Sequence, residues 1–209
     1  NKREKTELLI ATPSEGLAEL FYGLGEALTG EGGVSLGTIY LQLALDVKPD
    51  HAFALAALAN AQEAAKRYDD AIATYDRIPK GTPLQSAIDI RKAFNLNSLD
   101  RVDEAKAILE RLAANDPKDV RPLEALGNIL RARKEYAEAI KYFTRALAAL
   151  GKHDPRYWGY YYARGTSYER LKNWPAAEAD LKKALALAPD QPLVLNYLGY
   201  SWIDQGKNL

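Results

Sequence analysis

The stretch RYWGYYYARGTSYERL, residues 156–171, holds the densest group of side chains that could bind a ligand. It contains five tyrosines, one tryptophan and three arginines. Aromatic rings alternating with guanidinium groups can stack on nucleotide bases. The same residues can also be the core and edge positions of an amphipathic helix. The place of each residue in a helical pattern therefore decides between a nucleic-acid site and ordinary packing.

Other residues with catalytic or ligating side chains do not form a recognised site. His51 and His153 are the only histidines. No carboxylate–histidine spacing typical of zinc surrounds them, and we expect both to be exposed turn residues. The segment GLGEAL, residues 23–28, begins like a dinucleotide fingerprint. Leu28 fills its final glycine position and no strand precedes it, so we do not assign that function.

Paired carboxylates occur at Asp69-Asp70 and Asp103-Glu104. We expect them to open helices, where negative charge suits the helix dipole. The motifs GxxxxGK[ST] and HExxH do not occur in the sequence. We therefore predict no catalytic residue, no metal ligand and no cofactor, and we expect that the chain is not an enzyme.

Composition narrows the classes of partner. Lys+Arg and Asp+Glu both number 28, so the formal net charge is zero. A nucleic-acid-binding protein usually carries a basic excess, so nucleic acid is not an expected partner. The absence of cysteine excludes disulfides and thiolate sites. No apolar run approaches the roughly 18 residues of a membrane helix, so we expect no membrane insertion within this sequence.

Three ladders of residues recur along the chain with one period. Steps of 34 residues separate the members of each ladder, with a single step of 38. The ladders agree on one insertion, within residues 148–155. The members are Pro49, Pro83, Pro117, Pro155 and Pro189; Gly25, Ala59, Ala93, Gly127, Gly165 and Gly199; and Gly37, Ala71, Ala105, Ala139 and Ala177.

Each period predicts two amphipathic helices with small residues where they cross. Helices about 8–10 Å apart leave no room for a large side chain at the crossing. A proline ends the second helix, and Pro79 should cut one short. The insertion should lengthen the preceding helix or its loop. We expect first helices at 13–30, 52–65, 84–99, 120–133, 155–171 and 191–205, and second helices at 34–47, 69–79, 102–115, 136–150 and 174–187.

This pattern resembles the tetratricopeptide repeat. The best match is WGYYYARGTSYERLKNWPAAEADLKKALALAPDQ, residues 158–191, and the weakest is the third repeat, with Lys92 where the motif prefers Leu. The best match carries Gly165, Tyr168, Ala177, Ala184 and Pro189 where the family motif has Gly, Tyr, Ala, Ala and Pro. The resemblance implies an all-α, right-handed superhelical solenoid of antiparallel helix pairs with a concave groove. The repeats would be 18–51, 52–85, 86–119, 120–157 and 158–191, with a half repeat at 192–209 and a linker or the end of a preceding segment at 1–17.

The repeat pattern assigns each residue of the aromatic stretch 156–171 to a position on its helix. Tyr161 and Tyr168 fall at inter-helix positions, so core packing is expected for both. Tyr162 falls on the concave side, where a role in the groove and simple packing remain open. Arg164 replaces a usual leucine and should snorkel or pair with a carboxylate. Base stacking is disfavoured, because most of these rings face inward and the chain is neutral.

The resemblance implies a non-catalytic scaffold for protein–protein interaction that binds a peptide segment in its groove. Asn60 and Asn128 occur at one position in different repeats, and their amides would either bond a peptide backbone or merely face water. Arg121 and Arg131 are predicted on the groove side, where their positive charge would either attract a mildly acidic ligand segment or simply face water. The predicted groove residues are Tyr22, Asn60, Asn97, Arg121, Glu124, Asn128, Arg131, Tyr162, Thr166 and Tyr200, with Glu26, Phe53, Glu63, Glu169 and Arg170 at neighbouring groove positions.

Some family members bind a chaperone's acidic C-terminal tail through a clamp of Lys, Asn and Arg. Tyr22, Ala56 and Ile90 stand where that clamp needs lysine, so we do not expect this ligand class. The identity of the protein or peptide partner is not encoded in any feature of the sequence.

The C-terminal segment DQPLVLNYLGYSWIDQGKNL should form a first helix with Leu195, Leu198 and Trp202 on one face. Following residues, a partner or a second copy would cover that face, so self-association through 192–209 is an alternative. A further alternative is a regulatory or substrate-docking region of a larger protein with an enzymatic or envelope-assembly role. The sequence also resembles the middle of long bacterial repeat proteins, which implies an envelope or periplasmic location.

Overall fold

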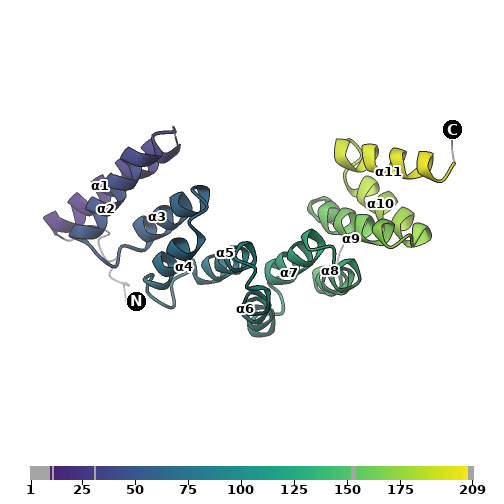
Figure 1. The fold of residues 1–209 in the computed structure, drawn as a ribbon, viewed down its shortest axis with the longest axis horizontal. Helices are drawn as coiled ribbons and strands as arrows, with labels where there is room; N and C mark the ends of the chain where they lie inside the picture. Colours follow the sequence, from purple (N-terminus) through teal and green to yellow (C-terminus); the bar gives the residue numbers. More distant parts are fainter. Residues whose placement is uncertain (1–9, 11, 31, 152–153, 207–209) are drawn as a thin grey trace, which may run out of the picture. The chain divides into compact units, whose positions relative to one another are not determined.

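The computed structural model describes residue 10 and residues 12–30, 32–151 and 154–206. All regular secondary structure in these ranges is helical (Figure 1). The predicted all-α architecture of paired helices is confirmed. The elements are α1 (Pro13–Gly30), α2 (Val34–Val47), α3 (Ala52–Ala64), α4 (Tyr68–Asp76), α5 (Gln85–Ser98), α6 (Val102–Asn115), α7 (Arg121–Ala132), α8 (Tyr136–Leu150), the 3₁₀ turn η1 (Pro155–Tyr157), α9 (Trp158–Arg170), α10 (Trp174–Leu187) and α11 (Pro192–Asp204).

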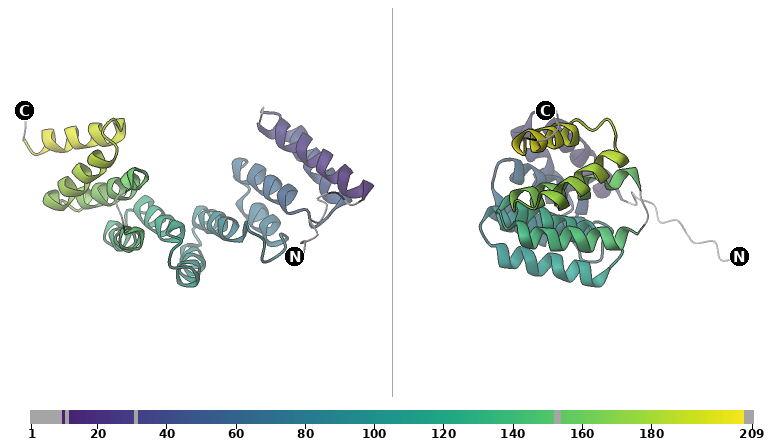
Figure 2. Two further views of the ribbon diagram at one scale, coloured as in Figure 1. Left: turned by 180° about the vertical axis from the view of Figure 1, so that it is seen from behind. Right: turned by 90° about the vertical axis from the view of Figure 1, so that its right-hand side faces the viewer.

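The chain divides into two compact units, residues 1–101 and residues 102–209. The first contains α1 to α5 and the second α6 to α11, and in each unit consecutive helices pack on one another (Figure 2). The division falls within residues 86–119, the repeat with the weakest match to the family motif.

Small residues at the helix crossings allow the close packing that the ladders predict. A Cβ atom on Gly37 of α2 would lie 2.7 Å from the carbonyl oxygen of Gly25 in α1. A Cβ atom on Gly127 of α7 would lie 2.7 Å from the ring of Phe143 in α8. Contacts this short are not tolerated. The exception is Gly199 in α11, where an added Cβ would meet nothing within 4 Å. The alanines of both ladders, Ala59, Ala71, Ala93, Ala105, Ala139 and Ala177, have no exposed surface.

Local sequence explains most helix boundaries. α4 ends at Asp76, so Pro79 follows a short helix as expected. Asn173 caps α10, its side chain accepting a hydrogen bond from the Ala176 amide, and Pro175 sits in the first turn. Two boundaries differ from the prediction, and the first is the end of α4, at Asp76 rather than at residue 79. The helix expected at 155–171 begins with the 3₁₀ turn η1, because Asp154 accepts a bond from the Arg156 amide and caps that turn.

The turn inside each repeat has a left-handed residue. The φ angles of Lys66, Asp100, Lys134 and Lys172 lie between 59° and 66°. The next amide then bonds a carbonyl of the preceding helix, as from Arg67 to Gln62 at 2.8 Å, a Schellman-type helix end. Gly32 and Gly206 hold the same conformation.

His51 is not the exposed turn residue that we predicted. It is 4% exposed. Its Nδ1 accepts a hydrogen bond from the Ala54 amide at 3.2 Å and so caps α3. Its Nε2 lies 3.1 Å from Glu19, and its ring packs on Tyr22 with 5.3 Å between centroids. Burial follows because the neighbouring repeat supplies both a ring and a carboxylate. His153 lies outside the described residues.

Candidate functional site

Arg164 forms an ion pair, as one of the two sequence interpretations predicts. Its Nε and Nη2 bond the two carboxylate oxygens of Asp180 in α10 at 2.7 and 2.8 Å. Its Nη1 donates to Thr144 of α8 at 3.0 Å, and the guanidinium lies 5.8 Å from the Tyr161 ring centroid. Tyr161 and Tyr168 are only half-buried, so their predicted core packing is incomplete. Arg164 thus occupies the space of a core leucine and joins three helices.

Tyrosine–glutamate bonds connect successive repeats in the second unit. Tyr142 donates to Glu110 at 2.6 Å, and Tyr160 donates to Glu124 at 2.8 Å. Burial, followed by the bond to Glu110, raises the pKa of Tyr142 to about 12. Burial, followed by the bond to Glu124, also raises the pKa of Tyr160. Glu124, a predicted groove residue, therefore already accepts a bond that positions α9 on α7.

The Tyr142 bond predicts an alkaline loss of stability. The folded-state pKa is raised from 10.0 to about 12, so the native state binds the phenolic proton more tightly than the unfolded chain. This stabilisation is complete below pH 10 and disappears as the pH rises through about 12. In urea unfolding, the free energy of unfolding should fall more steeply from pH 10 to 12 in the wild type than in Tyr142→Phe. Tyr68→Phe is the control for loss of one phenol, and equal slopes for wild type and Tyr142→Phe would contradict the expectation.

Two adjoining cavities lie on the surface formed by α7, α8, α9 and α11. The first, of about 160 Å³, is lined by Arg131, Tyr136, Tyr162, Thr166, Arg170 and Tyr197. The second, of about 190 Å³, is lined by Glu169, Arg170, Tyr197, Tyr200 and Ser201. Because Arg170 and Tyr197 line both, the two cavities adjoin. We call the two cavities together the α9–α11 groove.

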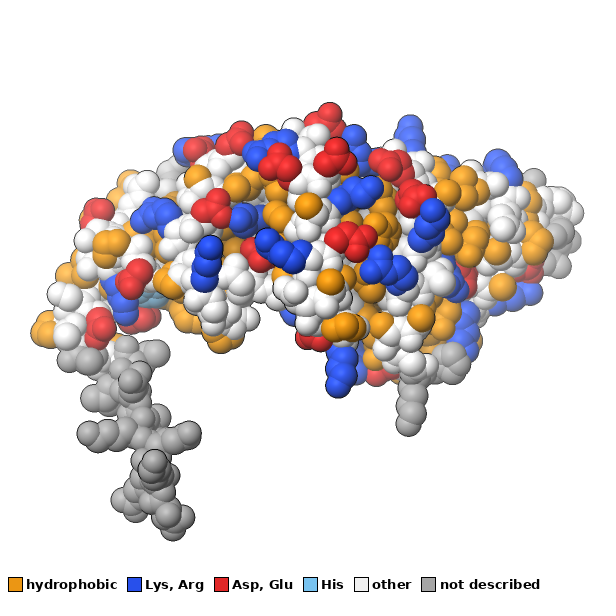
Figure 3. All heavy atoms as spheres, turned by 90° about the horizontal axis from the view of Figure 1, so that it is seen from below, with side chains coloured by type: hydrophobic (Ala, Val, Ile, Leu, Met, Phe, Trp, Pro, Cys, Tyr) orange, Lys and Arg blue, Asp and Glu red, His pale blue; other side chains and the backbone are white. Residues whose placement is uncertain are grey.

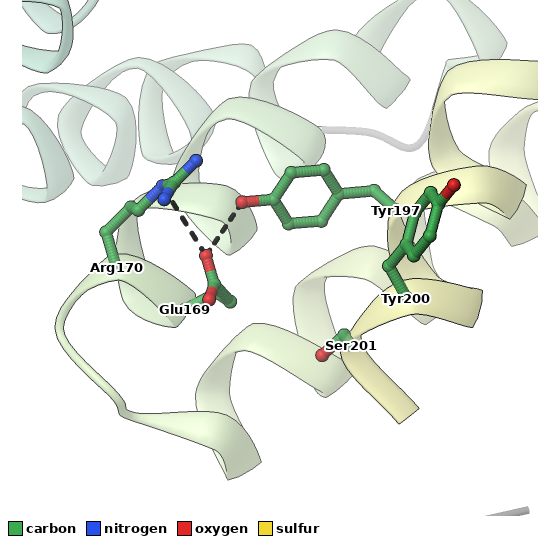
Figure 4. Close-up of a pocket in the computed structure, with 5 residues that line it drawn as sticks. All are labelled: Glu169, Arg170, Tyr197, Tyr200 and Ser201. Atoms are coloured by element: carbon green, nitrogen blue, oxygen red, sulfur yellow. Dashed lines mark hydrogen bonds and ion pairs between the residues drawn. The ribbon is translucent and has the colours of Figure 1, made fainter. Parts of the chain in front are cut away.

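The wall between these cavities is held by hydrogen bonds (Figure 4). Glu169, 8% exposed, accepts a bond from the Tyr197 hydroxyl at 2.7 Å and lies 3.6 Å from Nε of Arg170. Burial, followed by the bond to Glu169, raises the pKa of Tyr197, so the phenol stays a neutral donor. The Tyr197 ring also packs edge-on against Tyr162, with 5.8 Å between centroids. Contacts within the chain itself therefore fix the positions of Glu169, Tyr197 and Tyr162 in the groove.

The groove holds two arginines that can only donate, beside hydroxyls that can donate or accept. Arg131 makes one long bond, from Nη2 to Asn128 at 3.5 Å, and its Nε is buried without a partner among the described residues. The hydroxyls of Tyr136, Tyr162 and Tyr200 also lack a partner within the described ranges. Thr166 gives its proton to the Ala163 carbonyl at 3.0 Å, so its oxygen can only accept. The surface therefore suits a ligand rich in acceptors.

A third cavity, of about 310 Å³, lies in the first unit. It is lined by residues of α1, α2 and α3, among them Glu26, Val34 and Asn60. Asn60 accepts a bond from the Tyr75 hydroxyl at 2.7 Å, which leaves its amide donors available. Tyr75 in turn accepts a bond from Arg91 at 2.8 Å. Asn60 is thus held at the edge of a cavity by the next two helices.

The structure places four predicted groove residues, Arg131, Tyr162, Thr166 and Tyr200, in the α9–α11 groove. Asn60 lines the third cavity. The remaining predicted residues line none of the cavities described above. Arg121 is bound through two nitrogens to Asp119, both at 2.7 Å. Tyr22 packs on His51 and Phe53, and Asn128 contacts Arg131. The side-chain oxygen of Asn97 is buried and has no partner among the residues that the structure describes, and Glu124 accepts the Tyr160 bond.

Sequence reasoning missed Tyr136, Tyr197 and Ser201. Tyr136 opens a second helix, and Tyr197 lies on the side of its helix that faces the preceding repeat. Their spacing from Tyr162 along the chain does not indicate that Tyr136, Tyr162 and Tyr197 line one cavity. The tyrosines in α8 and α11 were the feature of the sequence that could have indicated these two helices as part of the site.

α11 presents exposed apolar side chains. Leu193, Leu195, Tyr200 and Ile203 are 57%, 48%, 63% and 59% exposed. Leu195 was predicted on an apolar face that other residues would cover, and it is exposed as that prediction requires. Leu198 of the same predicted face is buried, together with Val194, and Trp202 is half-buried, so that face is only partly bare.

Charged side chains of both signs are interspersed over the face in Figure 3, in keeping with the zero net charge. Among the described helices, none is both long and apolar enough to cross a membrane. The described residues also contain no cluster of three His, Asp or Glu side chains that could hold a metal ion.

Models of the tetratricopeptide repeat match residues 119–190 and residues 40–86, together more than half of the chain. Two curated proteins are similar over parts of their length. A UDP-N-acetylglucosamine–peptide N-acetylglucosaminyltransferase from Giardia intestinalis is 36% identical over 74 residues, which are 35% of this chain and 5% of that protein. The Hsp70-Hsp90 organizing protein of Triticum aestivum is 28% identical over 133 residues, 64% of this chain and 21% of that protein. The chain thus spans a small part of either relative.

Solved structures share the fold at low identity. A tetratricopeptide repeat protein from Parabacteroides merdae is 18% identical with a TM-score of 0.71, covering 94% of this chain and 75% of that one. YrrB, described as a TPR protein with an unusual peptide-binding site, is 19% identical with a TM-score of 0.58, covering 86% and 91%. Paired helices, small residues at their crossings and these matches lead to one conclusion. The chain belongs to the tetratricopeptide repeat family and has the fold of a protein-interaction scaffold.

Proposed function

We propose that this protein is a non-catalytic scaffold that binds an extended peptide segment of a partner protein in the α9–α11 groove. The observation that carries the proposal is that two cavities adjoin and share Arg170 and Tyr197 in their linings. A row of adjoining cavities suits a chain-like ligand better than a single compact molecule.

The side chains of the groove supply both parts of peptide recognition. Tyr162, Tyr197 and Tyr200 offer flat apolar surface with few rotatable bonds to immobilise. Arg170 and the hydroxyls of Tyr162 and Tyr200 can donate to peptide carbonyls, and the Thr166 oxygen can accept from a peptide amide. The relative described as having an unusual peptide-binding site supports the same kind of ligand. Asn60 and its cavity in the first unit are a second candidate contact.

Synthetic peptide pools test the proposal. The pools are seven-residue peptides with acetylated and amidated ends, and binding to the full chain is followed by fluorescence anisotropy. Tyr162→Ala should weaken binding of the selected pool at least about tenfold, since it removes a ring from the centre of the groove. Tyr157→Ala removes a half-buried tyrosine outside both cavities and is the matched control.

Equal loss of binding in the two variants, or no binding by any pool, would refute the groove assignment. Light scattering of the same samples addresses self-association through α11. A monomer throughout the micromolar range would leave the exposed side chains of that helix without a role in dimer formation.

A further inference from the structure

The first cavity of the α9–α11 groove has the chemistry of a carboxylate site. Arg131 lies in its wall and forms no ion pair within the described part of the chain. Its Nε is buried with no acceptor among the described residues, although a buried donor without a partner is costly. A carboxylate is the acceptor that fits a guanidinium edge best, through two parallel bonds.

The neighbouring groups add to this preference. Arg170 lines the same cavity and is only partly neutralised by Glu169, at 3.6 Å and without a second contact. The hydroxyl of Tyr162 has no partner within the described ranges and can donate to the same anion. By contrast, Arg121, Arg156 and Arg164 are each bound to an aspartate through two nitrogens. Arg131 therefore differs from these arginines in having its charge available to a ligand.

Glu169 sets the position of the acid along the groove. It lines the second cavity together with Tyr200 and Ser201, and its charge would repel a carboxylate placed there. An acidic ligand residue is therefore favoured in the first cavity, beside Arg131, and an uncharged residue in the second. Because the cavities adjoin, the ligand chain continues past the acidic residue and does not end at it.

We propose that the cavity lined by Arg131, Tyr162 and Arg170 binds the side-chain carboxylate of an internal aspartate or glutamate in the partner peptide. The proposal rests on the peptide-binding function above and specifies its ligand. The adjacent ligand residue, over Tyr200 and Ser201, is uncharged.

The test uses the same end-blocked seven-residue pools with the central position fixed as Glu, Asp, Gln, Asn or Lys. Glu and Asp pools should bind the full chain about ten- to a hundredfold more tightly than Gln and Asn pools, the range expected for charge-assisted hydrogen bonds. Arg131→Gln should bring the pools within about threefold of one another by removing that bond. Arg156→Gln changes the net charge equally at an exposed site outside both cavities and should leave the preference intact.

Three results would overturn the proposal. The first is equal binding of acidic and amide pools. If Tyr162→Ala still abolished that binding, the peptide groove would stand without an acid pocket. The second is an acid preference that survives Arg131→Gln. The third is Arg131-dependent binding only by a pool with a free C-terminal carboxylate and no Asp or Glu, which would identify a chain end as the ligand. Circular dichroism of each variant establishes that the helices are retained.

Discussion

Replacement of Arg164 by leucine should lower the free energy of unfolding by about 3 kcal/mol, although leucine is the usual residue of the repeat at this position. Asp180 is 7% exposed, and Arg164 supplies its paired hydrogen bonds at 2.7 and 2.8 Å. Without the guanidinium, a charged carboxylate stays buried between α9 and α10. An uncompensated buried charge costs more than the leucine gains by burial.

Urea unfolding followed by circular dichroism measures this effect, and two variants make it specific. The double variant Arg164→Leu/Asp180→Leu should recover stability to within about 1 kcal/mol of the wild type, because no buried charge remains. Arg156→Leu breaks an equally well-formed pair with Asp154 whose arginine is 83% exposed, and should leave the free energy of unfolding nearly unchanged. A loss below about 1 kcal/mol in the single variant would mean that Asp180 finds water or another donor.

Phe143→Ala should destabilise the second unit by about 3–5 kcal/mol. The ring has no exposed surface and packs with Leu130, Ala139 and Ala163. It also lies over Gly127, where an added Cβ would be 2.7 Å from the ring. Truncation would leave a cavity that the glycine on the facing helix cannot fill. The transition midpoint in urea is the measured quantity.

A substitution at Gly127 tests the same contact from the other helix. Gly127→Ala alone should cost about 1–3 kcal/mol by overpacking against the ring. In a Phe143→Leu background the same change should cost less, since the obstructing ring atoms are gone. Phe53→Ala, at a 53% exposed phenylalanine, is the control and should cost less than about 1 kcal/mol. Additive costs for Gly127→Ala and Phe143→Leu would contradict direct contact between the two positions.

The helices were predictable from the sequence because their determinants are local. Small residues recur where helices cross, and a proline or capping residue marks an end, as Asn173 and Pro175 do for α10. The prediction failed where the decisive partner comes from another repeat. His51 is buried because Tyr22 and Glu19 meet it, and neither is near it in the chain.

The groove could be predicted only in part for the same reason. Helical position alone places Tyr162, Thr166 and Arg131 on one surface. It does not show that Tyr160 engages Glu124, or that Tyr197 engages Glu169 and completes the wall between the cavities. Those contacts depend on how far a long side chain of one repeat reaches across to the next. The residues of such a groove therefore emerge from packing between repeats rather than from the motif.

The lysines at the left-handed turns are suitable sites for attaching a chemical label. Lys66, Lys134 and Lys172 have a backbone conformation that is unfavourable for any residue with a side chain. The two helices on either side of each turn impose this conformation. All three are exposed, at the equivalent turn of three different repeats. A dye, crosslinker or affinity handle attached at these ammonium groups would stand at the turn between the two helices of a repeat.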